Sequence, residues 1–521
     1  MLIFALALFA ALPLRVDPWV YERLDLELRV TPPAVELRGK GVVRLDAGES
    51  DGPTFRINNR KHVMKLRELR SGSVTATIAP FKDAVDTAKL TFDRPFKAGD
   101  SIEFEFIAQS DEESMQFVID NRAAYASWVE YWYPVPAASA EERSSPAVPG
   151  TTSFVLPKGW HAASNGALTE QNGREVWTSE VPVARSFVAA PFAVRDRVGD
   201  ISLFLLDPRP GIAEQAAALA KSLAVMEQRF GPYPYPTYHI VEVPWGNGFT
   251  ASSEQGFIVV IPAILNSPKG NLPLFAHEAA HGWWGNLVRP DGPGGKMVSE
   301  ALAQLGALVS IESVEGRAAA AEFLRYSRKG YSPKQCARGY FEIWRDGGDR
   351  PLAQLEAAKW DHHISDSKGM WFYHMLRNRM GDEAFFGALR TFLDRFRGRK
   401  ATVKDLREIV IAARPDDAGL PQFLSQWLDG RGAPVLDVDW RAGADGKTIE
   451  IHIEQTPKLP PFVFDLEVVV DTKGGGAEKK TLQIREREHM FTFPALGRPV
   501  AVHLDPDDRV LIWRPEYGPK P

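Results

Sequence analysis

The chain has 521 residues, of which 44% are hydrophobic and 25% are charged, with a formal net charge of −5 and a pI of about 6.2. This is an ordinary globular composition, with length for about three domains. The mild acidity and the lack of a long basic run argue against nucleic-acid binding. The single cysteine, Cys336, excludes an intramolecular disulfide but leaves the compartment open.

An uncharged apolar run occupies residues 1–14 and ends at Arg15. It is short for a membrane span but has the length of a signal peptide's apolar region. No basic residue precedes it and its cleavage signal is poor, so a buried first strand and a misplaced start codon stay open as alternatives. We expect residues 1–15 to direct export, giving a periplasmic or secreted protein, with a cytoplasmic protein as the alternative. No other stretch is apolar enough to predict an integral membrane span.

Residues 16–198 have a pattern typical of strands. Apolar residues alternate or cluster in short segments between Gly, Pro, Asp and Ser turns, at 24–30, 42–45, 101–107 and 153–156. We therefore predict an all-β N-terminal domain that spans residues 16–198.

The pattern changes after about residue 200, where helical periods dominate. Helices are predicted at 212–230, 272–288, 297–314, 369–380, 383–397, 403–413 and 421–428, with strands at 238–243 and 257–261. Residues 199–432 are thus expected to form a mixed domain rich in helices.

A Gly-Arg-Gly-Ala-Pro segment at 430–434 ends this region. Short strands follow at 435–440, 449–454, 464–470, 481–485 and 500–504, separated by turns. Residues 433–521 are therefore predicted to form a C-terminal β-sandwich.

The segment 277–281 reads His-Glu-Ala-Ala-His, and Glu300 follows after eighteen intervening residues. On a helix, His277 and His281 lie one turn apart and point the same way, so they can supply two nitrogen ligands of a zinc ion. A catalytic zinc needs a third protein ligand and an open position, and Glu300 is the candidate ligand. Glu278 lies off the ligand stripe and can act as the general base on a zinc-activated water. A hydrogen-bonded structural histidine pair is the alternative.

The segment 275–288 resembles the zinc helix of the aminopeptidase N family, a group of gluzincin metallopeptidases. The resemblance rests on the Trp-Trp-Gly-Asn sequence at 283–286 and on the spacing to Glu300. Ser299 and Ala301 stand where members usually have Asn and Gly. Looser similarity extends over 156–166, 187–192 and 369–511. It implies a multidomain α+β fold with an N-terminal β saddle domain, a thermolysin-like, mostly helical catalytic domain and a C-terminal β-sandwich, in a member that lacks the C-terminal helical domain.

The same resemblance implies one Zn²⁺ ion as cofactor and a peptide with a free N-terminus as substrate. Family members bind the substrate's α-ammonium group through a Gly-x-Met-Glu-Asn loop, and the corresponding stretch here is 251–256. Glu254 is the glutamate of that stretch, so it is expected to bind the substrate amine. A solvated loop glutamate is the alternative.

A second departure concerns the transition state. The family has a tyrosine in Tyr-x-Lys-Gly whose hydroxyl stabilises the oxyanion, and Asp366 occupies that position here. An ionised aspartate only accepts hydrogen bonds, so it cannot replace that donor. His362, His363, Tyr373 and Tyr340 are the alternative donors.

The sequence thus predicts a zinc-dependent metallopeptidase, with an aminopeptidase that cleaves the N-terminal peptide bond as the leading hypothesis. A metallated but slow or inactive peptide-binding protein and an endopeptidase are the alternatives. The preferred N-terminal residue and the oligomeric state cannot be deduced from the sequence.

Overall fold

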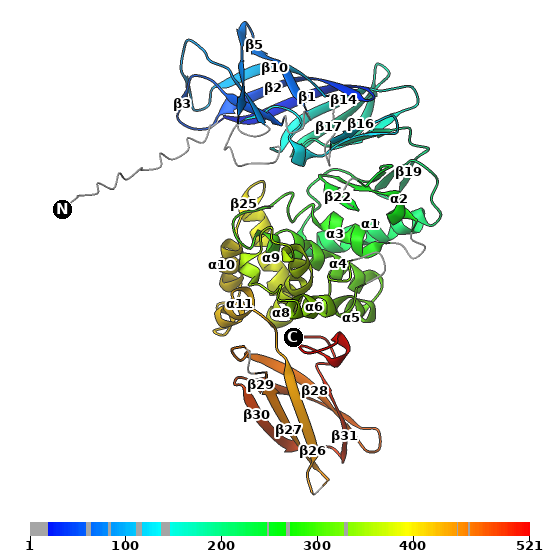
Figure 1. Ribbon diagram of the computed structural model, residues 1–521, viewed down its shortest axis with the longest axis vertical. Helices are drawn as coiled ribbons and strands as arrows, with labels where there is room; N and C mark the ends of the chain where they lie inside the picture. Colours follow the sequence, from blue (N-terminus) through cyan, green and yellow to red (C-terminus); the bar gives the residue numbers. More distant parts are fainter. Residues whose placement is uncertain are drawn as a thin grey trace, which may run out of the picture. The chain divides into compact units, whose positions relative to one another are not determined.

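The computed structural model describes residues 19–58, 64–81, 85–110, 117–136, 146–246, 250–266, 271–327, 332–444, 446–456 and 459–521 (Figure 1). The expected export signal at residues 1–15 lies outside this description. The chain divides into two compact units. Unit 1 comprises the chain up to Pro208 together with Tyr235–Pro262, and unit 2 comprises Arg209–Pro234 and Ala263–Pro521. N-terminal sheets, a helical central region and C-terminal sheets confirm the predicted multidomain α+β class. The domain boundaries drawn from the sequence stay predictions.

The largest sheet of unit 1 has eight strands in the order β16-β17-β14-β1-β2-β10-β5-β6. Its strands are β1 (Trp19–Thr31), β2 (Ala34–Leu45), β5 (Lys65–Ser71), β6 (Val74–Thr75), β10 (Ser101–Ser110), β14 (Val148–Val155), β16 (Ala167–Gln171) and β17 (Arg174–Val183). Alternate residues of β1, β2 and β10 are buried, as a sheet with one covered face requires. On that face a Cβ at Gly39 would lie 2.2 Å from the Phe106 ring, so the ring needs glycine beneath it.

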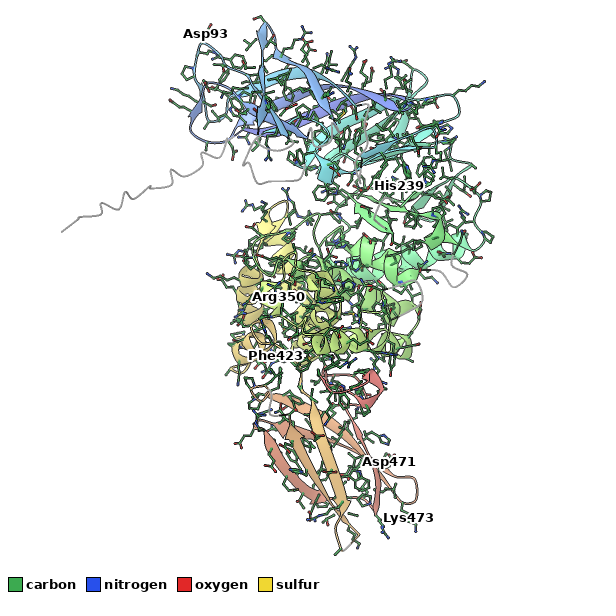
Figure 2. The ribbon with its side chains drawn as sticks, in the orientation of Figure 1. Asp93, His239, Arg350, Phe423, Asp471 and Lys473 are labelled. Atoms are coloured by element: carbon green, nitrogen blue, oxygen red, sulfur yellow. The ribbon has the colours of Figure 1, made fainter. Side chains whose placement is uncertain are left out.

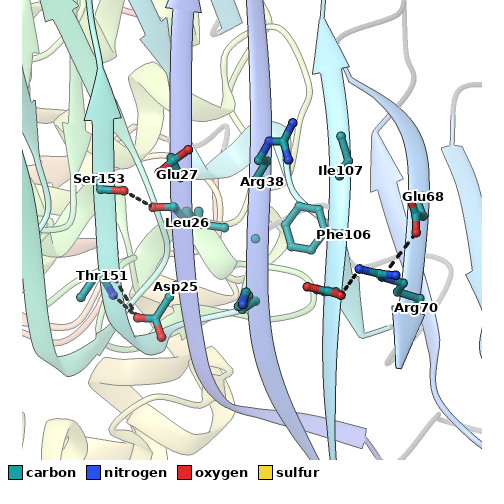
Figure 3. A pocket seen from close by; sticks show the side chains of 13 residues that line it. Asp25, Leu26, Glu27, Arg38, Glu68, Arg70, Phe106, Ile107, Thr151 and Ser153 are labelled. Atoms are coloured by element: carbon teal, nitrogen blue, oxygen red, sulfur yellow. Dashed lines mark hydrogen bonds and ion pairs between the residues drawn. The ribbon is translucent and has the colours of Figure 1, made fainter. Parts of the chain in front are cut away.

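The other face of this sheet carries a shallow depression lined largely by charged side chains (Figure 3). Arg70 lies 2.5 Å from Glu105 and 3.4 Å from Glu68, while Asp25 accepts hydrogen bonds from the backbone and hydroxyl of Thr151. These side chains form ion pairs and hydrogen bonds with one another, so the depression is an ion-paired surface of the sheet.

Unit 1 contains four further sheets. Three are small: β11-β12-β18-β15, β13-β4-β8-β7 and β3-β9. Their strands are β3 (Glu49–Ser50), β4 (Thr54–Asn58), β7 (Thr77–Phe81), β8 (Val85–Lys89), β9 (Phe96–Lys97), β11 (Phe117–Ile119), β12 (Ala124–Ala126), β13 (Val135–Pro136), β15 (His161–Ser164) and β18 (Phe187–Ala190).

The fifth sheet of unit 1 has the order β19-β20-β21-β23-β22. It is formed by β19 (Val194–Val198), β20 (Ile201–Leu205), β21 (Tyr238–Glu242), β22 (Ala251–Glu254) and β23 (Phe257–Val260). β20, β21 and β23 run parallel and are rich in buried apolar residues, as the centre of a covered parallel sheet requires. β22 is an antiparallel edge strand, and it ends at Glu254.

The helices of unit 2 are α1 (Ile212–Phe230), α3 (Leu272–Ala280), α4 (Glu300–Val314), α5 (Arg317–Arg325), α6 (Ala337–Arg345), α7 (Asp361–Ile364), α8 (Met370–Met380), α9 (Asp382–Phe396), α10 (Val403–Ala413) and α11 (Leu420–Leu428), while α2 (Pro262–Leu265) begins at the last residue of unit 1. α4 is buried nearly all round and packs against α1 and α3. Contrary to the expectation from the sequence, α4 and the turn before it form a stretch, Gly295–Val314, that is long and apolar enough to cross a membrane, but 72% of its most apolar window is buried within the protein. α4 is therefore a core helix.

Two features of unit 2 differ from the sequence predictions. The metal helix was predicted over 272–288, but α3 ends at Ala280, and the chain turns through Gly285, which has a φ of 107°. Tight turns follow α3, with Gly285 N–H donating to Val288 O. The short helices α5 and α6, nine residues each, were not predicted from the sequence.

Two three-stranded sheets end unit 2, in the orders β26-β27-β30 and β29-β28-β31. Their strands are β26 (Leu436–Ala442), β27 (Thr448–Gln455), β28 (Phe464–Thr472), β29 (Ala477–Ile484), β30 (Glu488–Pro494) and β31 (Pro499–Leu504). Ile449, Ile451 and Ile453 alternate into the interior from β27. Five of these six strands match predicted segments, and β30 is the addition.

Candidate metal centre

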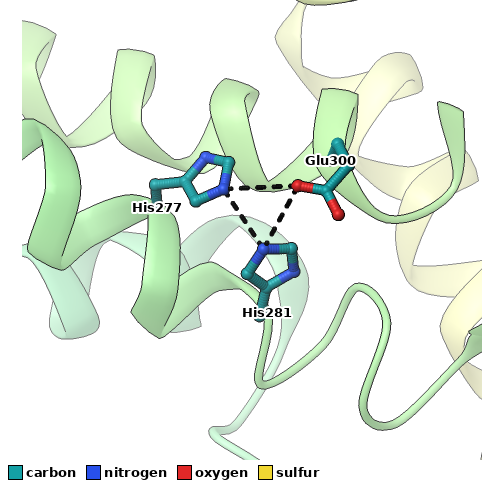
Figure 4. A group of neighbouring side chains, drawn as sticks. All are labelled: His277, His281 and Glu300. Carbon is teal, nitrogen blue, oxygen red and sulfur yellow. Dashed lines mark hydrogen bonds and ion pairs between the residues drawn. The ribbon is translucent and has the colours of Figure 1, made fainter. Parts of the chain in front are cut away.

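The candidate ligands lie on two packed helices of unit 2 (Figure 4). His277 sits in the last turn of α3, His281 follows its last residue, and Glu300 is the first residue of α4. The two helices approach closely because Gly306 of α4 faces Ala280 of α3. A Cβ at Gly306 would lie 2.4 Å from the Ala280 Cβ. The absence of a side chain at Gly306 thus allows the histidines of α3 to lie close to Glu300 of α4.

Three ligand atoms converge as the sequence predicted. His277 Nε2 lies 3.2 Å from His281 Nε2, and these atoms lie 3.6 Å and 3.7 Å from Glu300 Oε2. A point equidistant from atoms spaced in this way is about 2 Å from each, the length of zinc bonds to histidine nitrogen and carboxylate oxygen. Two imidazoles and one carboxylate are also a donor set that zinc prefers. The residues present therefore fit the ion.

Hydrogen bonds to the other ring nitrogens fix the tautomers. His277 Nδ1 donates to Gln304 Oε1 and His281 Nδ1 donates to Trp284 O, both at 2.8 Å. Each Nε2 lone pair is then directed to the centre, as in metal-bound histidines. Sequence reasoning missed Gln304. The signal was there, since Gln304 is a buried polar residue one turn after Glu300 in an apolar helix.

Negative charge gathers around the centre. Burial lowers the pKa of His277, but the carboxylates of Glu300, Asp366 and Glu278 outweigh it and raise the pKa to about 9. Burial opposes ionisation of Glu300, yet His277, His281 and His362 hold its pKa well below the usual range. The carboxylates favour positive charge at the neighbouring histidines, so the site is electrostatically suited to a cation.

Glu278 follows His277 on α3 and interacts electrostatically with both metal-site histidines. Burial raises the pKa of its carboxyl group, and His277 and His281 act in the opposite direction. It does not belong to the ligand group His277-His281-Glu300. A carboxylate beside the ligands but outside their group has the placement of a general base.

Glu254 belongs to unit 1, where it is fully buried and 0% exposed. Four hydroxyl groups donate to its carboxylate: Tyr125 at 2.7 Å, Ser127 at 3.1 Å, Ser186 at 2.5 Å and Ser252 at 3.3 Å. Burial raises its pKa and the hydroxyl donors counter the rise. A solvated loop glutamate, the alternative left open by the sequence, does not describe this residue.

Asp366 lies in a single π-helical turn, Ser365–Gly369, and is 0% exposed. Gln335 Nε2 donates to its Oδ2 at 2.5 Å, and His362 Nε2 lies 3.3 Å from the same oxygen. His362 Nδ1 lies 3.6 Å from Glu300 Oε2. The sequence did not indicate that His362 and Asp366 reach Glu300 together.

Three of the four candidate oxyanion donors contact groups outside the metal centre. Tyr373 donates its hydroxyl to Met297 O at 2.7 Å, and Tyr340 donates to Asp349 Oδ1 at 2.8 Å. The His363 ring packs against Trp360. His362 is the candidate with a contact to a metal-site residue in the described part of the chain.

Comparisons with known proteins agree with this centre. Residues 215–427 match the Peptidase family M1 domain. The chain is 23% identical to the human aminopeptidase RNPEPL1 over 58% of this chain and 44% of that protein. It is also 23% identical to aminopeptidase N of Lactobacillus delbrueckii subsp. lactis, over 46% of this chain and 30% of that protein. The chain thus spans less than half the length of these relatives.

Two solved structures share the fold. Legionella pneumophila aminopeptidase A in complex with aspartic acid has a TM-score of 0.66 at 16% identity, over 95% of this chain and 59% of that one. A mutant of an M1 zinc metallopeptidase from Deinococcus radiodurans has a TM-score of 0.60 at 18% identity, over 80% of this chain and 96% of that one. The match to the second structure includes nearly all of that protein, which is shorter than this chain.

Proposed function

Because the chain belongs to peptidase family M1, we propose that it is a zinc-dependent aminopeptidase that hydrolyses the N-terminal bond of peptides with a free N-terminus. One observation carries the proposal: the Nε2 atoms of His277 and His281 converge with Glu300 Oε2 at ligand spacing, with Glu278 beside them. Zinc in this site would polarise the scissile carbonyl group and acidify a water molecule.

The protein groups would then divide the proton transfers. Glu278 takes a proton from the attacking water and delivers it to the leaving amine. Gln304 and the carbonyl of Trp284 keep the two imidazoles in the ligating tautomer throughout. Glu254 pairs with the substrate's α-ammonium group in this proposal.

The general base is tested by Glu278→Gln, which keeps the shape of the side chain but removes its basicity. We expect the zinc content to stay at the wild-type level, while kcat on aminoacyl anilides falls by about 10²–10⁴-fold. Metal analysis and steady-state kinetics measure the two effects. Glu408→Gln, an exposed change on α10, is the matched control and should have wild-type kinetics. Full turnover in a zinc-loaded Glu278→Gln protein would contradict the role.

The amine contact is tested by Glu254→Gln with two substrates. A carboxylate offers about four acceptor positions, and four hydroxyl groups already approach Glu254, so an ammonium ion has to share its oxygens with them. If Glu254 binds the amine, kcat/KM for the free peptide falls at least tenfold, while slow cleavage of the N-acetylated peptide is unchanged.

A purely structural Glu254 gives a different result. The melting temperature of Glu254→Gln then falls because hydroxyl donors lose their charged partner, and both substrates lose activity alike. Glu103→Gln, on the exposed face of β10, is the control for a change of charge in unit 1. Equal loss on both substrates rejects amine recognition.

A slow or inactive peptide-binding protein is the second candidate, and Asp366 is the observation that favours it. Losing one oxyanion donor lowers turnover by about 10²–10³-fold. An endopeptidase is the third candidate. A panel of free and N-blocked substrates separates the three: turnover of free amines alone supports the aminopeptidase, cleavage of blocked peptides supports the endopeptidase, and peptide binding without turnover supports the binding protein.

A further inference from the structure

The four hydroxyl groups around Glu254 divide between its two carboxylate oxygens. Ser127 and Ser186 donate to Oε2, at 3.1 and 2.5 Å, while Tyr125 and Ser252 donate to Oε1, at 2.7 and 3.3 Å. All five residues belong to unit 1. Each oxygen therefore has its own pair of donors, and the two pairs can be compared.

Ser186, on the Oε2 side, is held on all of its polar groups. It is 0% exposed, and its Oγ accepts a hydrogen bond from Trp128 N–H at 2.9 Å, so the hydroxyl proton is available to Glu254. Its backbone N–H donates to Asn165 Oδ1, and its carbonyl accepts from the Ser164 hydroxyl, both at 2.7 Å. The Ser186 oxygen cannot move away from Oε2 without breaking another bond.

Ser252, on the Oε1 side, differs from the other donors in exposure and in geometry. Tyr125, Ser127 and Ser186 are buried, whereas Ser252 is half-buried and lies on β22, the edge strand. Its 3.3 Å bond is the longest of the four and exceeds the usual O–H···O length of about 2.5–3.0 Å. Ser252 also shares a hydrogen bond with the Tyr125 hydroxyl, so it keeps a partner when it leaves Glu254.

An amine that reaches Glu254 has to compete with these hydroxyl groups. A carboxylate offers about four acceptor positions, and the four donors already approach them. An ammonium group forms a stronger bond to a carboxylate than a neutral hydroxyl does, because it is charged. It replaces most readily the donor with the weakest bond and the greatest access to solvent, which is Ser252.

We propose that the substrate's α-ammonium group displaces the Ser252 hydroxyl from Oε1 of Glu254, while Ser186 is the positioning residue that holds Oε2. The inference rests on the proposed function, because it requires Glu254 to bind the substrate amine. It gives the two serines opposite effects on affinity. Removing the Ser186 hydroxyl loosens the carboxylate, whereas removing the Ser252 hydroxyl removes a competitor of the amine.

The test measures peptide affinity by calorimetry in the zinc-loaded full chain. Every protein carries Glu278→Gln so that the peptide stays intact, and the probes are trialanine amide and its N-acetylated form. Ser186→Ala should weaken binding of the free peptide at least tenfold, as expected when a charged group loses a hydrogen bond. Ser252→Ala should bind the free peptide as tightly as the parent protein, or up to about fivefold more tightly. The acetylated peptide should bind all of these proteins alike.

Two further variants make the comparison secure. Ser127→Ala removes the second donor to Oε2 and should weaken binding of the free peptide by about threefold or more, so it tests the same oxygen if Ser186→Ala does not fold. Ser179→Ala is the matched control. Ser179 is also 0% exposed and in unit 1, but its hydroxyl donates to Val181 O at 2.8 Å. Both affinities should be unchanged in this variant.

The pH dependence of binding is a readout that a purely structural serine would not change. Burial raises the pKa of Glu254, and the bond from Ser186 is the largest of the effects that lower it again. Tyr125 is the titratable group among the four donors, and burial holds its pKa well above the ordinary value, so it stays neutral. In Ser186→Ala the pKa of Glu254 should rise further. Affinity for the free peptide should then be lost at a higher pH on acidification than in the parent protein or in Ser179→Ala.

Three outcomes decide the question. If Ser252→Ala weakens binding of the free peptide, or Ser186→Ala leaves it unchanged, while Glu254→Gln still weakens it selectively, the roles of the two serines are wrong and the aminopeptidase proposal stands. Equal losses for both peptides in Ser186→Ala and Glu254→Gln reject amine binding by Glu254, and this inference with it. If neither peptide binds any of the proteins, the proposed function itself is rejected.

Discussion

His239 of β21, labelled in Figure 2, belongs to unit 1. Aromatic rings surround it, with ring centroids of Trp177, Phe204 and Phe257 at 5.3, 5.6 and 6.5 Å. It is 3% exposed, and neither ring nitrogen has a hydrogen-bond partner among the described residues. Burial, with a smaller contribution from Arg197, lowers the pKa of His239 to about 3. The imidazole therefore stays neutral in the folded protein under conditions where it is protonated in the unfolded chain.

This gives a pH-dependent prediction. Below pH 6.5 the unfolded chain binds a proton at this residue, while the folded protein does not until about pH 3. The free energy of unfolding of unit 1 should therefore decrease as the pH is lowered through this window. From this group alone the decrease is about 3 kcal/mol between pH 7 and pH 4. In His239→Phe that contribution vanishes, and stability at pH 7 rises by about 1 kcal/mol because unpaired polar atoms are removed. Urea unfolding at both pH values measures this.

His503→Gln is the control, since His503 belongs to unit 2 and its replacement should leave the pH profile of unit 1 unchanged. Parallel pH profiles for wild type and His239→Phe would show that His239 is protonated in the folded state, contrary to the prediction.

At the scale of single residues, the sequence predicted those contacts that depend only on the spacing of residues close together in the chain. His277, His281 and Glu300 were predictable because a helical period and one short connection set their geometry. The partners of Glu254 were not, since Tyr125 and Ser127 precede it by 129 and 127 residues. The contact of His362 with Glu300 was hidden for the same reason: it depends on how α7 packs against α4.

Among the elements, α3 and α4 show how packing limits sequence prediction. The apolar pattern of 272–288 suggested one long helix, but α3 ends at Ala280 and the following apolar residues pack from turns. Burial alone therefore cannot separate a helix from a compact run of turns. α1 and α10 were predicted with their observed bounds because each is amphipathic and ends at a clear signal, such as Gly231 after α1.

The contact between α3 and α4 carries a prediction about metal affinity. In Gly306→Ala the added methyl group would lie 2.4 Å from Ala280 Cβ, so the helices must separate. We expect a stability loss of about 1–3 kcal/mol. Zinc affinity should fall at least tenfold, because His277 and Glu300 move apart. Thermal unfolding and competition with a chelator measure the two effects.

The same substitution elsewhere provides the control. Gly387 lies within α9, where an added Cβ meets only the flexible end of Arg390 at 3.9 Å. Gly387→Ala should stabilise the protein by about 0.5–1 kcal/mol, since alanine favours the helix, and should leave zinc affinity unchanged. If Gly306→Ala kept wild-type zinc affinity, the glycine contact would not control the ligand geometry.

For the whole chain, the sequence suggested three domains and the contacts of the structure define two units. Residues 263–521, including the helices and the C-terminal sheets, belong to the same unit. The Gly-Arg-Gly-Ala-Pro segment at 430–434 looks like a linker in the sequence. Its flanking regions are nevertheless tied by contacts such as the Gln426 side chain with both backbone polar groups of Val463. Composition shows where a chain turns, but not how firmly the two sides of the turn pack.

Asp508 makes several such contacts, and they allow the cooperativity of unit 2 to be tested. It follows β31 and is 1% exposed. Its carboxylate pairs with Arg325 of α5 at 2.6 Å and with Arg514 at 3.1 Å, and its backbone carbonyl accepts a hydrogen bond from His374 of α8 at 2.8 Å. The residue thus connects the C-terminal sheets to two helices of the central region.

Asp508→Asn removes the charge while keeping the size of the side chain. We expect the free energy of unfolding of unit 2 to fall by about 2 kcal/mol, less than for a fully buried pair because Arg325 is partly exposed. Hydrogen exchange should speed up alike in α5, α8 and β31, since they share this tie. Asp507→Asn, one residue earlier with a side chain 58% exposed, should change stability by less than about 0.5 kcal/mol. Faster exchange confined to β31 would show instead that the sheets unfold independently of the helices.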